Sequence, residues 1–416
     1  MMVHNIATII ALAALAEPVL GGSRAWEAPL RHDVHLDRRR FQAIPVDEAG
    51  YAIRDSMMAS NVSSHHKRYF SVKPGSSEDS TRLWPDKTIS YCYATQESRE
   101  AIEEGLEAAF NMWAVQLEDG SSGLNRLAYK YKEVAEPGKA CTENKQRDRI
   151  LVISHNNLGI HSTTVARPPL NSDRPEYKGP SMRLSSVSNV GQLNRVANWA
   201  HEVGHAWGLY HEHQNPAFWN YPYAHTSDIF QGEVFGQHFD CHALKDWPKV
   251  RDQILRKYPN DPEKRREQEH AVCNEQQAAS EYDFSALDWL PLKGTFLYTQ
   301  GIAVEGAGYV DVDWKSIMLY PSGAGGTGTA REPLNPDEPS SIYDQRTPVL
   351  LRNDGQKILA NAIPSPKDIA GIRRLYENVN INHEGEAFVL PNDKKSPNFG
   401  KFIKSFLGKK DKTCDT

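Results

Sequence analysis

The stretch His201-Glu202-Val203-Gly204-His205-Ala206-Trp207-Gly208-Leu209-Tyr210-His211 decides how this chain is interpreted. In a helix, residues i and i+4 lie on one face, so His201 and His205 can direct two imidazoles at one point. Gly208 can adopt a positive φ, which ends the helix and turns the chain sharply. The turn allows His211 to return to the same point. We therefore expect a helix, a sharp turn and three converging imidazoles.

Three imidazoles are a ligand set that suits one Zn²⁺, and they leave the fourth position open, as in catalytic rather than structural zinc sites. The sequence thus predicts a catalytic zinc ion on His201, His205 and His211. Zinc lowers the pKa of a bound water from about 15.7 to about 7. Glu202 lies off the ligand face but within reach of that water, and we expect it to act as the catalytic base. No covalent intermediate is needed.

The pattern is more specific than a pair of histidines. With 16 histidines in 416 residues, three His, one Glu and one Gly at these offsets arise by chance roughly once in ten thousand chains. The alternative interpretation is a helix with solvated histidines. His238 and His242 also stand at i, i+4, but no glutamate or third ligand accompanies them. We interpret that pair as part of a surface segment.

The flanking sequence predicts both strands and helices. Residues 88–93 alternate like a half-buried strand, and residues 149–153, Arg-Ile-Leu-Val-Ile, are interpreted as a buried strand. Residues 182–186 are interpreted as a shorter strand at the edge of the sheet. Apolar side chains recur at helical spacing over 102–117 and again over 365–376, where Ser-Pro begins the helix. This order predicts an α+β fold in which sheet and helices pack against each other.

Charge and composition narrow the function classes. A net charge of -5 provides no basic surface for nucleic acid, so we expect no such partner. The apolar run 6–16 ends in Ala14-Leu15-Ala16, which predicts a signal peptide over residues 1–16. No later run reaches the roughly 18 apolar residues of a membrane span. We expect a secreted, extracellular protein.

Five cysteines fit an oxidising compartment without forming a disulfide scaffold. Their connectivity cannot be read from the sequence. Pairing of nearest neighbours, Cys92 with Cys141 and Cys241 with Cys273, is the arrangement that we favour, and it leaves Cys414 over.

Both ends of the chain are expected to lie apart from the catalytic core. Residues 17–68 are interpreted as a propeptide, with Lys67-Arg68 as the processing junction and Arg38-Arg39-Arg40 as a second candidate. Residues 381–416 form a polar C-terminal tail in which apolar side chains recur at helical spacing among lysines. Such a helix can lie on an anionic membrane, but we favour its docking on the chain's own domain.

The pattern HExxHxxGxxH is the metzincin signature, and Glu212 directly after the third histidine resembles the astacin subgroup. Residues 316–320, Ser-Ile-Met-Leu-Tyr, resemble the astacin Met-turn. The resemblance implies a metzincin-like zinc protease domain over 69–380, with a twisted sheet, an active-site helix and a Met-turn. A large insertion at about 220–310 would split this domain, since the motif and the Met-turn lie far apart in the chain.

The same resemblance assigns roles to single residues. Met318 would lie beneath the metal as an apolar base, and Tyr320 would be a distant zinc ligand that swings to stabilise the oxyanion. The freed amino terminus of the processed chain would pack near Glu212. The sequence departs from the family at Leu319, where astacins have His, and at residues 213–216, where they have Arg.

These observations favour a secreted, zinc-dependent metalloendopeptidase that acts on protein or peptide substrates as a monomer. One alternative is a catalytically silent, secreted binding protein that zinc stabilises, although loss of Glu202 would be its usual sign. Another is a zinc hydrolase of a sugar or lipid amide, which would need neither the segment 316–320 nor an edge strand at 182–186 to align a peptide.

Overall fold

The structure is a computed structural model, and the residues that it describes are 69–72, 83–117, 129–167, 178–219, 234–292, 297–300, 312–331 and 343–377. The predicted signal peptide, the propeptide with Lys67-Arg68, Cys414 and the polar tail lie outside these residues. Within the described part of the chain, no helix is both long enough and apolar enough to cross a membrane.

A five-stranded sheet in the order β3-β2-β4-β6-β5 underlies one half of the fold. The first four strands are parallel, and β5 runs antiparallel to β6. Ile89 and Tyr93 are buried in the main core, as the alternating pattern predicted. The bounds of the strands are β2 Thr88–Tyr93, β3 Lys130–Glu133, β4 Leu151–Asn156, β5 Ser162–Thr163 and β6 Ser181–Ser185.

The prediction that residues 182–186 form the edge of the sheet is wrong. The two-residue strand β5 covers the outer side of β6, where Ser162 pairs with Arg183. Further along, the backbone N–H of Ser185 donates to Nδ1 of His161 at 3.4 Å. A strand of two residues leaves too little alternation to be recognised in a sequence.

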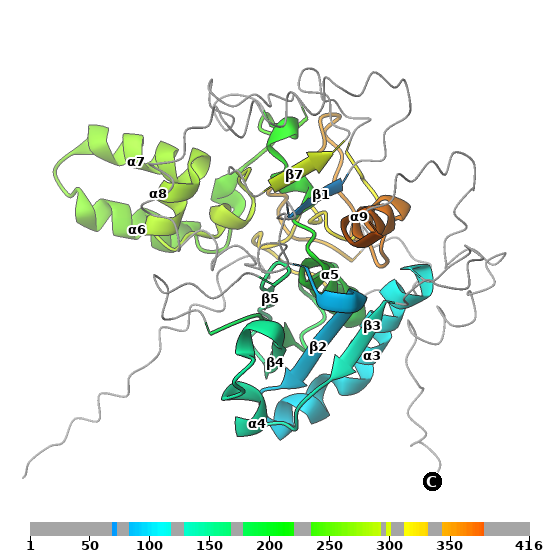
Figure 1. The fold of residues 1–416 in the computed structure, drawn as a ribbon. Helices are drawn as coiled ribbons and strands as arrows, with labels where there is room; N and C mark the ends of the chain where they lie inside the picture. The colour runs from blue at the N-terminus through cyan, green and yellow to red at the C-terminus, as the bar shows by residue number, and fades with distance from the viewer. Residues whose placement is uncertain are drawn as a thin grey trace, which may run out of the picture.

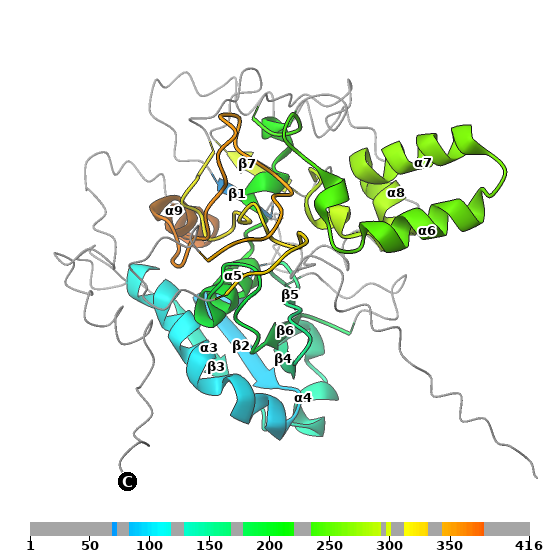
Figure 2. The same cartoon turned by 180° about the vertical axis from the view of Figure 1, so that it is seen from behind.

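Two helices cover one face of the sheet, α3 (Gln96–Leu117) and α5 (Arg195–Trp207), and α9 (Pro366–Glu377) packs against α3 in the same apolar core. Figures 1 and 2 show α3 and α5 lying beside β2. Helices α3 and α5 pack closely at Gly105, where glycine is required because a Cβ would lie 2.3 Å from the ring of Trp199. The short α4 (Lys139–Thr142) packs on the opposite face.

The second half of the chain has its own apolar core and a helical lobe, which stands to one side of the sheet in Figure 1. The charged run 261–270 begins at the N-cap of helix α7 (Pro262–Asn274) and is largely exposed. Outside the lobe, β1 (Tyr69–Val72) pairs antiparallel with β7 (Leu297–Gln300). The elements of the lobe are α6 (Trp247–Lys257), α7 (Pro262–Asn274), α8 (Gln276–Glu281) and the 3-10 helix η9 (Ser285–Asp288).

Both predicted disulfides are present. Cys92 on β2 is bonded to Cys141 on α4, and Cys241 is bonded to Cys273 on α7. The fold is therefore a mixed arrangement of one five-stranded sheet and helices, in agreement with the predicted class at this level.

Candidate metal centre

Local sequence determines where helix α5 begins and ends. The side chain of Asn194 caps the helix by accepting a hydrogen bond from the backbone N–H of Ala197 at 2.9 Å. At the other end, Gly208 has a φ of 109°, a left-handed conformation that favours glycine. The predicted helix and the sharp turn after it are both confirmed.

Buried indoles fix the position of α5 in the core. Trp113 of α3 donates to the carbonyl of Ala200 at 2.7 Å, and Trp84 donates to the carbonyl of Ala206 at 2.7 Å. Trp199, on α5 itself, donates to the end of β6 at 2.8 Å. These directional contacts set the rotation of the helix about its axis, and so the direction of the histidines along it.

The three imidazoles of the motif converge as predicted. Nε2 of His205 lies 3.1 Å from Nε2 of His201 and 3.1 Å from Nε2 of His211. Two imidazole nitrogens on a tetrahedral zinc ion, each about 2.0–2.1 Å from the metal, lie about 3.3 Å apart. The spacing of the three nitrogens therefore fits a metal ion at their centre.

The other nitrogen of each ring explains why this point suits a cation. Each Nδ1 faces an oxygen that can only accept, which keeps the proton on Nδ1 and leaves the lone pair on Nε2. Lone pairs at 3.1 Å repel each other unless a cation lies between them. The Nδ1 partners are the carbonyl of Ile317 for His201 at 2.6 Å, the carbonyl of Leu209 for His205 at 2.7 Å and Oε1 of Gln214 for His211 at 2.7 Å.

Burial keeps these rings neutral. It lowers the pKa of His205 to about 4, and it lowers the pKa values of His201 and His211 well below their usual range. Neutral imidazole is the form that binds metals. The three side chains thus form a buried group that could bind a metal ion.

Two more predicted residues lie at this group. Glu202 is fully buried on α5, close enough for its charge to oppose the effect of burial on the pKa of His205. Met318 packs directly under the helix, because a Cβ at Gly204 would lie 2.4 Å from its sulfur. Met318 is therefore buried against α5 between the two helical histidines, and its place beneath a metal ion stays a prediction.

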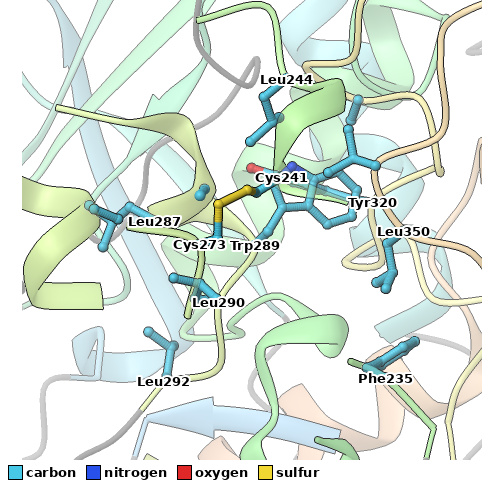
Figure 3. Packing of buried hydrophobic residues seen from close by; sticks show 14 of the residues in the cluster. Phe235, Cys241, Leu244, Cys273, Leu287, Trp289, Leu290, Leu292, Tyr320 and Leu350 are labelled. Carbon is cyan, nitrogen blue, oxygen red and sulfur yellow. A yellow bond between two sulfur atoms is a disulfide. The ribbon is translucent and has the colours of Figure 1, made fainter. Parts of the chain in front are cut away.

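Tyr320 lies beside the histidines. The centre of its ring is 4.3 Å from that of His211 and 6.0 Å from that of His201. Trp289, from the segment after η9, packs edge-on against Tyr320 at 5.1 Å, and both are drawn in Figure 3. His213 stacks on His211 with the ring centres 5.1 Å apart. The tyrosine is therefore held between the motif and the helical lobe.

The site also includes residues that were not predicted to belong to it: His213, Gln214 and the segment 285–292. His213 and Gln214 are fully buried, and both bond to backbone carbonyls of that segment. The two residues were noted from the sequence only because they depart from the pattern of the family that the motif resembles. A polar pair two and three positions after a predicted ligand, in a chain with a long insertion, is the signal that could have found them.

Glu212, the next residue after the third histidine, accepts a hydrogen bond from the backbone N–H of Asp313 at 3.0 Å. Burial first, and then the charge of Asp313, raise the pKa of Glu212 to about 8. Processing after Arg68 would free the amino group of Tyr69, the first residue of β1, which pairs with Gln300 of β7. Its packing near Glu212 in the processed chain stays a prediction.

The pair His238 and His242 lies at the surface, as predicted. His242 does come close to Cys241 and Cys273, a second arrangement of metal-binding residue types. Those two cysteines are joined as a disulfide, and a disulfide offers no thiolate to a metal.

Comparisons with known proteins found one distant structural match and no match in sequence. No protein-family model and no curated protein match the sequence. Among solved structures, the chain is similar to high choriolytic enzyme 1, a hatching enzyme zinc-protease from the medaka fish Oryzias latipes. The identity is 15%, the match covers 74% of this chain and 98% of the medaka chain, and the TM-score is 0.35. A TM-score this low does not establish a shared family or function.

Proposed function

We propose that this chain is a secreted zinc metalloendopeptidase, with the metal on His201, His205 and His211 and with Glu202 as the catalytic base. One observation carries the proposal: three neutral, buried imidazoles converge beside a buried glutamate, with Nε2 of His205 3.1 Å from Nε2 of both other rings and each Nδ1 bonded to an acceptor oxygen. That arrangement is costly for a fold to maintain unless a cation occupies it.

Zinc at this point would supply a Lewis acid and lower the pKa of a water to about 7. Glu202 follows His201 directly on α5, so its carboxylate lies off the helix face that carries the two histidines. It takes a proton from the attacking water and passes it to the leaving amine, as a general acid–base does. A buried carboxylate keeps this proton from bulk solvent during the transfer.

Tyr320 is proposed to stabilise the oxyanion that forms at the scissile carbonyl. The centre of its ring is 4.3 Å from that of His211. A phenol hydroxyl that donates a hydrogen bond in a water-excluded site strongly stabilises the negative charge of an oxyanion. The tyrosine's own motif, residues 316–320, is what sets this proposal apart from a hydrolase of sugar or lipid amides.

Burial of the site adds a requirement for opening. His201, Glu202, His205 and His211 are all completely buried in the full-length chain. A peptide can therefore reach them only after a covering segment moves. We propose that cleavage at Lys67-Arg68 releases the active form, and that the intact chain is latent.

The test uses unfolded casein and four samples: the intact chain, the chain processed after Arg68, and the processed Glu202→Gln and Tyr320→Phe variants. Processed protein should cut casein, and a zinc chelator should stop the reaction until zinc is restored. Glu202→Gln should lower the rate about 10²–10⁴-fold while the zinc content stays at one ion per chain. A Glu202→Gln protein that cuts as fast as its parent would sink the assignment of the base.

The same burial favours a second candidate, a secreted binding protein that zinc stabilises without catalysis. Complete burial of all three ligands is typical of a structural metal site rather than a substrate cleft. If processed, zinc-loaded protein cuts no peptide while zinc raises its unfolding temperature, this second candidate is the better account.

A further inference from the structure

Gln214 is fully buried and makes contacts on two sides. Its Oε1 accepts the proton on Nδ1 of His211 at 2.7 Å. Its Nε2 donates to the carbonyls of Leu287 at 3.2 Å and Leu290 at 3.1 Å. Its own backbone carbonyl accepts from the N–H of Leu292 at 2.9 Å. One side chain thus joins the third histidine to the segment that follows η9.

The segment determines which way the amide of Gln214 faces. A flipped amide would place its oxygen against two carbonyl oxygens, and an NH₂ group against the N–H of His211. The carbonyls of Leu287 and Leu290 therefore direct Oε1 toward His211, and Oε1 in turn holds the proton on Nδ1. The lone pair of His211 Nε2 faces the other two histidines as a result.

The three histidines differ in this support. Nδ1 of His201 and Nδ1 of His205 both bond to backbone carbonyls, which no side-chain substitution can remove. Only His211 depends on a side chain, and that side chain depends on a segment some 70 residues away. The neighbouring His213 strengthens the same junction through Nε2 and the carbonyl of Asp288, at 3.0 Å.

We propose that Gln214 is a positioning residue of the metal centre, and that it makes the packing of residues 285–292 and the affinity for the metal depend on each other. The proposal rests on the zinc centre proposed above and deepens it. Coupling of this kind is reciprocal, so the metal must protect the segment as much as the segment favours the metal.

The first test measures zinc affinity of the full-length chain by competition with a chromophoric chelator. Gln214→Met keeps the volume but removes both amide functions, and we expect the zinc Kd to rise about 10–100-fold, as is usual when the partner of a ligand histidine is lost. Gln214→Glu keeps an acceptor for His211 and should stay within about tenfold of the parent, although its thermal stability falls.

Gln116→Met is the matched control. Gln116 is also buried, but its amide donates to the carbonyl of Met112 within α3, at 3.2 Å, and not to His211 or to the segment 285–292. Its loss should lower stability and leave the zinc Kd unchanged. A merely structural role for Gln214 would instead make the zinc Kd of all three variants follow their stability.

The second test compares hydrogen exchange of the chain with and without zinc. Protection should increase in 285–292 as well as in 201–214, with β4 (Leu151–Asn156) as the unaffected reference. In Gln214→Met, zinc should no longer protect 285–292. Parental zinc affinity in folded Gln214→Met, or zinc protection of 201–214 alone, overturns the inference and leaves the zinc centre intact. A parent chain that binds no zinc overturns the metal centre itself, and the inference with it.

Discussion

The segments 201–211 and 285–292 are connected through Gln214, but their positions are determined in different ways. The first contains its own geometry: two histidines one turn apart, a left-handed glycine and a returning third histidine. The second contributes backbone carbonyls and one indole, and any sequence has carbonyls. It is held by tertiary contacts, among them two hydrogen bonds from Ser285 to Asp246.

The difference separates two kinds of information in a metal site. Ligands recur at spacings that the helix dictates, so one sequence is enough to find them. The groups that orient the ligands are chosen by shape and hydrogen bonding across the fold, where no spacing rule applies. Each prediction below asks whether the two segments contribute to the site as this division requires.

The largest effect is expected from the first segment. His205→Ala removes the ligand that stands 3.1 Å from both other Nε2 atoms, and the purified protein should contain no zinc by elemental analysis. His242→Ala, in the exposed second histidine pair, is the control and should keep one ion per chain. Full zinc content in His205→Ala, or loss of zinc in His242→Ala, would place the metal elsewhere.

The second segment should show its contribution through Trp289. This side chain is fully buried and touches the rings of both Tyr320 and His213. Trp289→Ala should lower the free energy of unfolding by about 3–5 kcal/mol, as large-to-small core changes do, and should also weaken zinc binding about tenfold or more.

Phe110→Ala provides the comparison. Phe110 is also buried, in the core between α3 and the sheet, where it stacks on Tyr131, and its loss should cost a similar free energy of unfolding. Urea unfolding with and without zinc measures both quantities. If zinc stabilises the Trp289 variant as much as it stabilises its parent, the second segment has no part in the metal centre.

A smaller effect is expected from acid, and it belongs to the sheet side of the molecule. Burial, with a smaller contribution from His155, lowers the pKa of His161 to about 3. Between pH 6.5 and 3 the unfolded chain therefore binds a proton at this residue that the folded chain does not. Stability from His161 is complete above pH 6.5 and is lost as the pH falls.

The measurement is the free energy of unfolding at pH 7.5 and pH 5. His161→Asn keeps an acceptor for the N–H of Ser185 but cannot be protonated, so it should lose about 2 kcal/mol less than its parent over this interval. Identical losses in the two proteins would mean that His161 is accessible to protons in the fold.

Much of the fold near the motif could be predicted from the sequence. Side chains alternate along residues 88–93, with Ile89 and Tyr93 on the buried face. The apolar residues of α3 recur at helical spacing, and Gly208 ends α5 where a positive φ is required. The strand, the helix and the turn depend on near neighbours in the chain, which is why one sequence suffices for them. Both disulfides agree with the nearest-neighbour pairing that we favoured, although connectivity does not follow from sequence.

The position of β5 and the role of the helical lobe could not be predicted. β5 has two residues and is defined only by its partner β6. A glutamine such as Gln214 is usually exposed, and here it is buried because it donates to the carbonyls of Leu287 and Leu290. In both places the deciding contact joins residues far apart in sequence, and periodicity carries no record of such contacts.

The most direct test of the metal centre is anomalous scattering at the zinc absorption edge from crystals of the full-length chain grown with zinc. We expect one peak, with Nε2 of His201, His205 and His211 each about 2.0–2.1 Å from it and Gln214 still bonded to His211. A map with no peak between these three nitrogens, or with its peak beside Cys241, His242 and Cys273, would contradict the account.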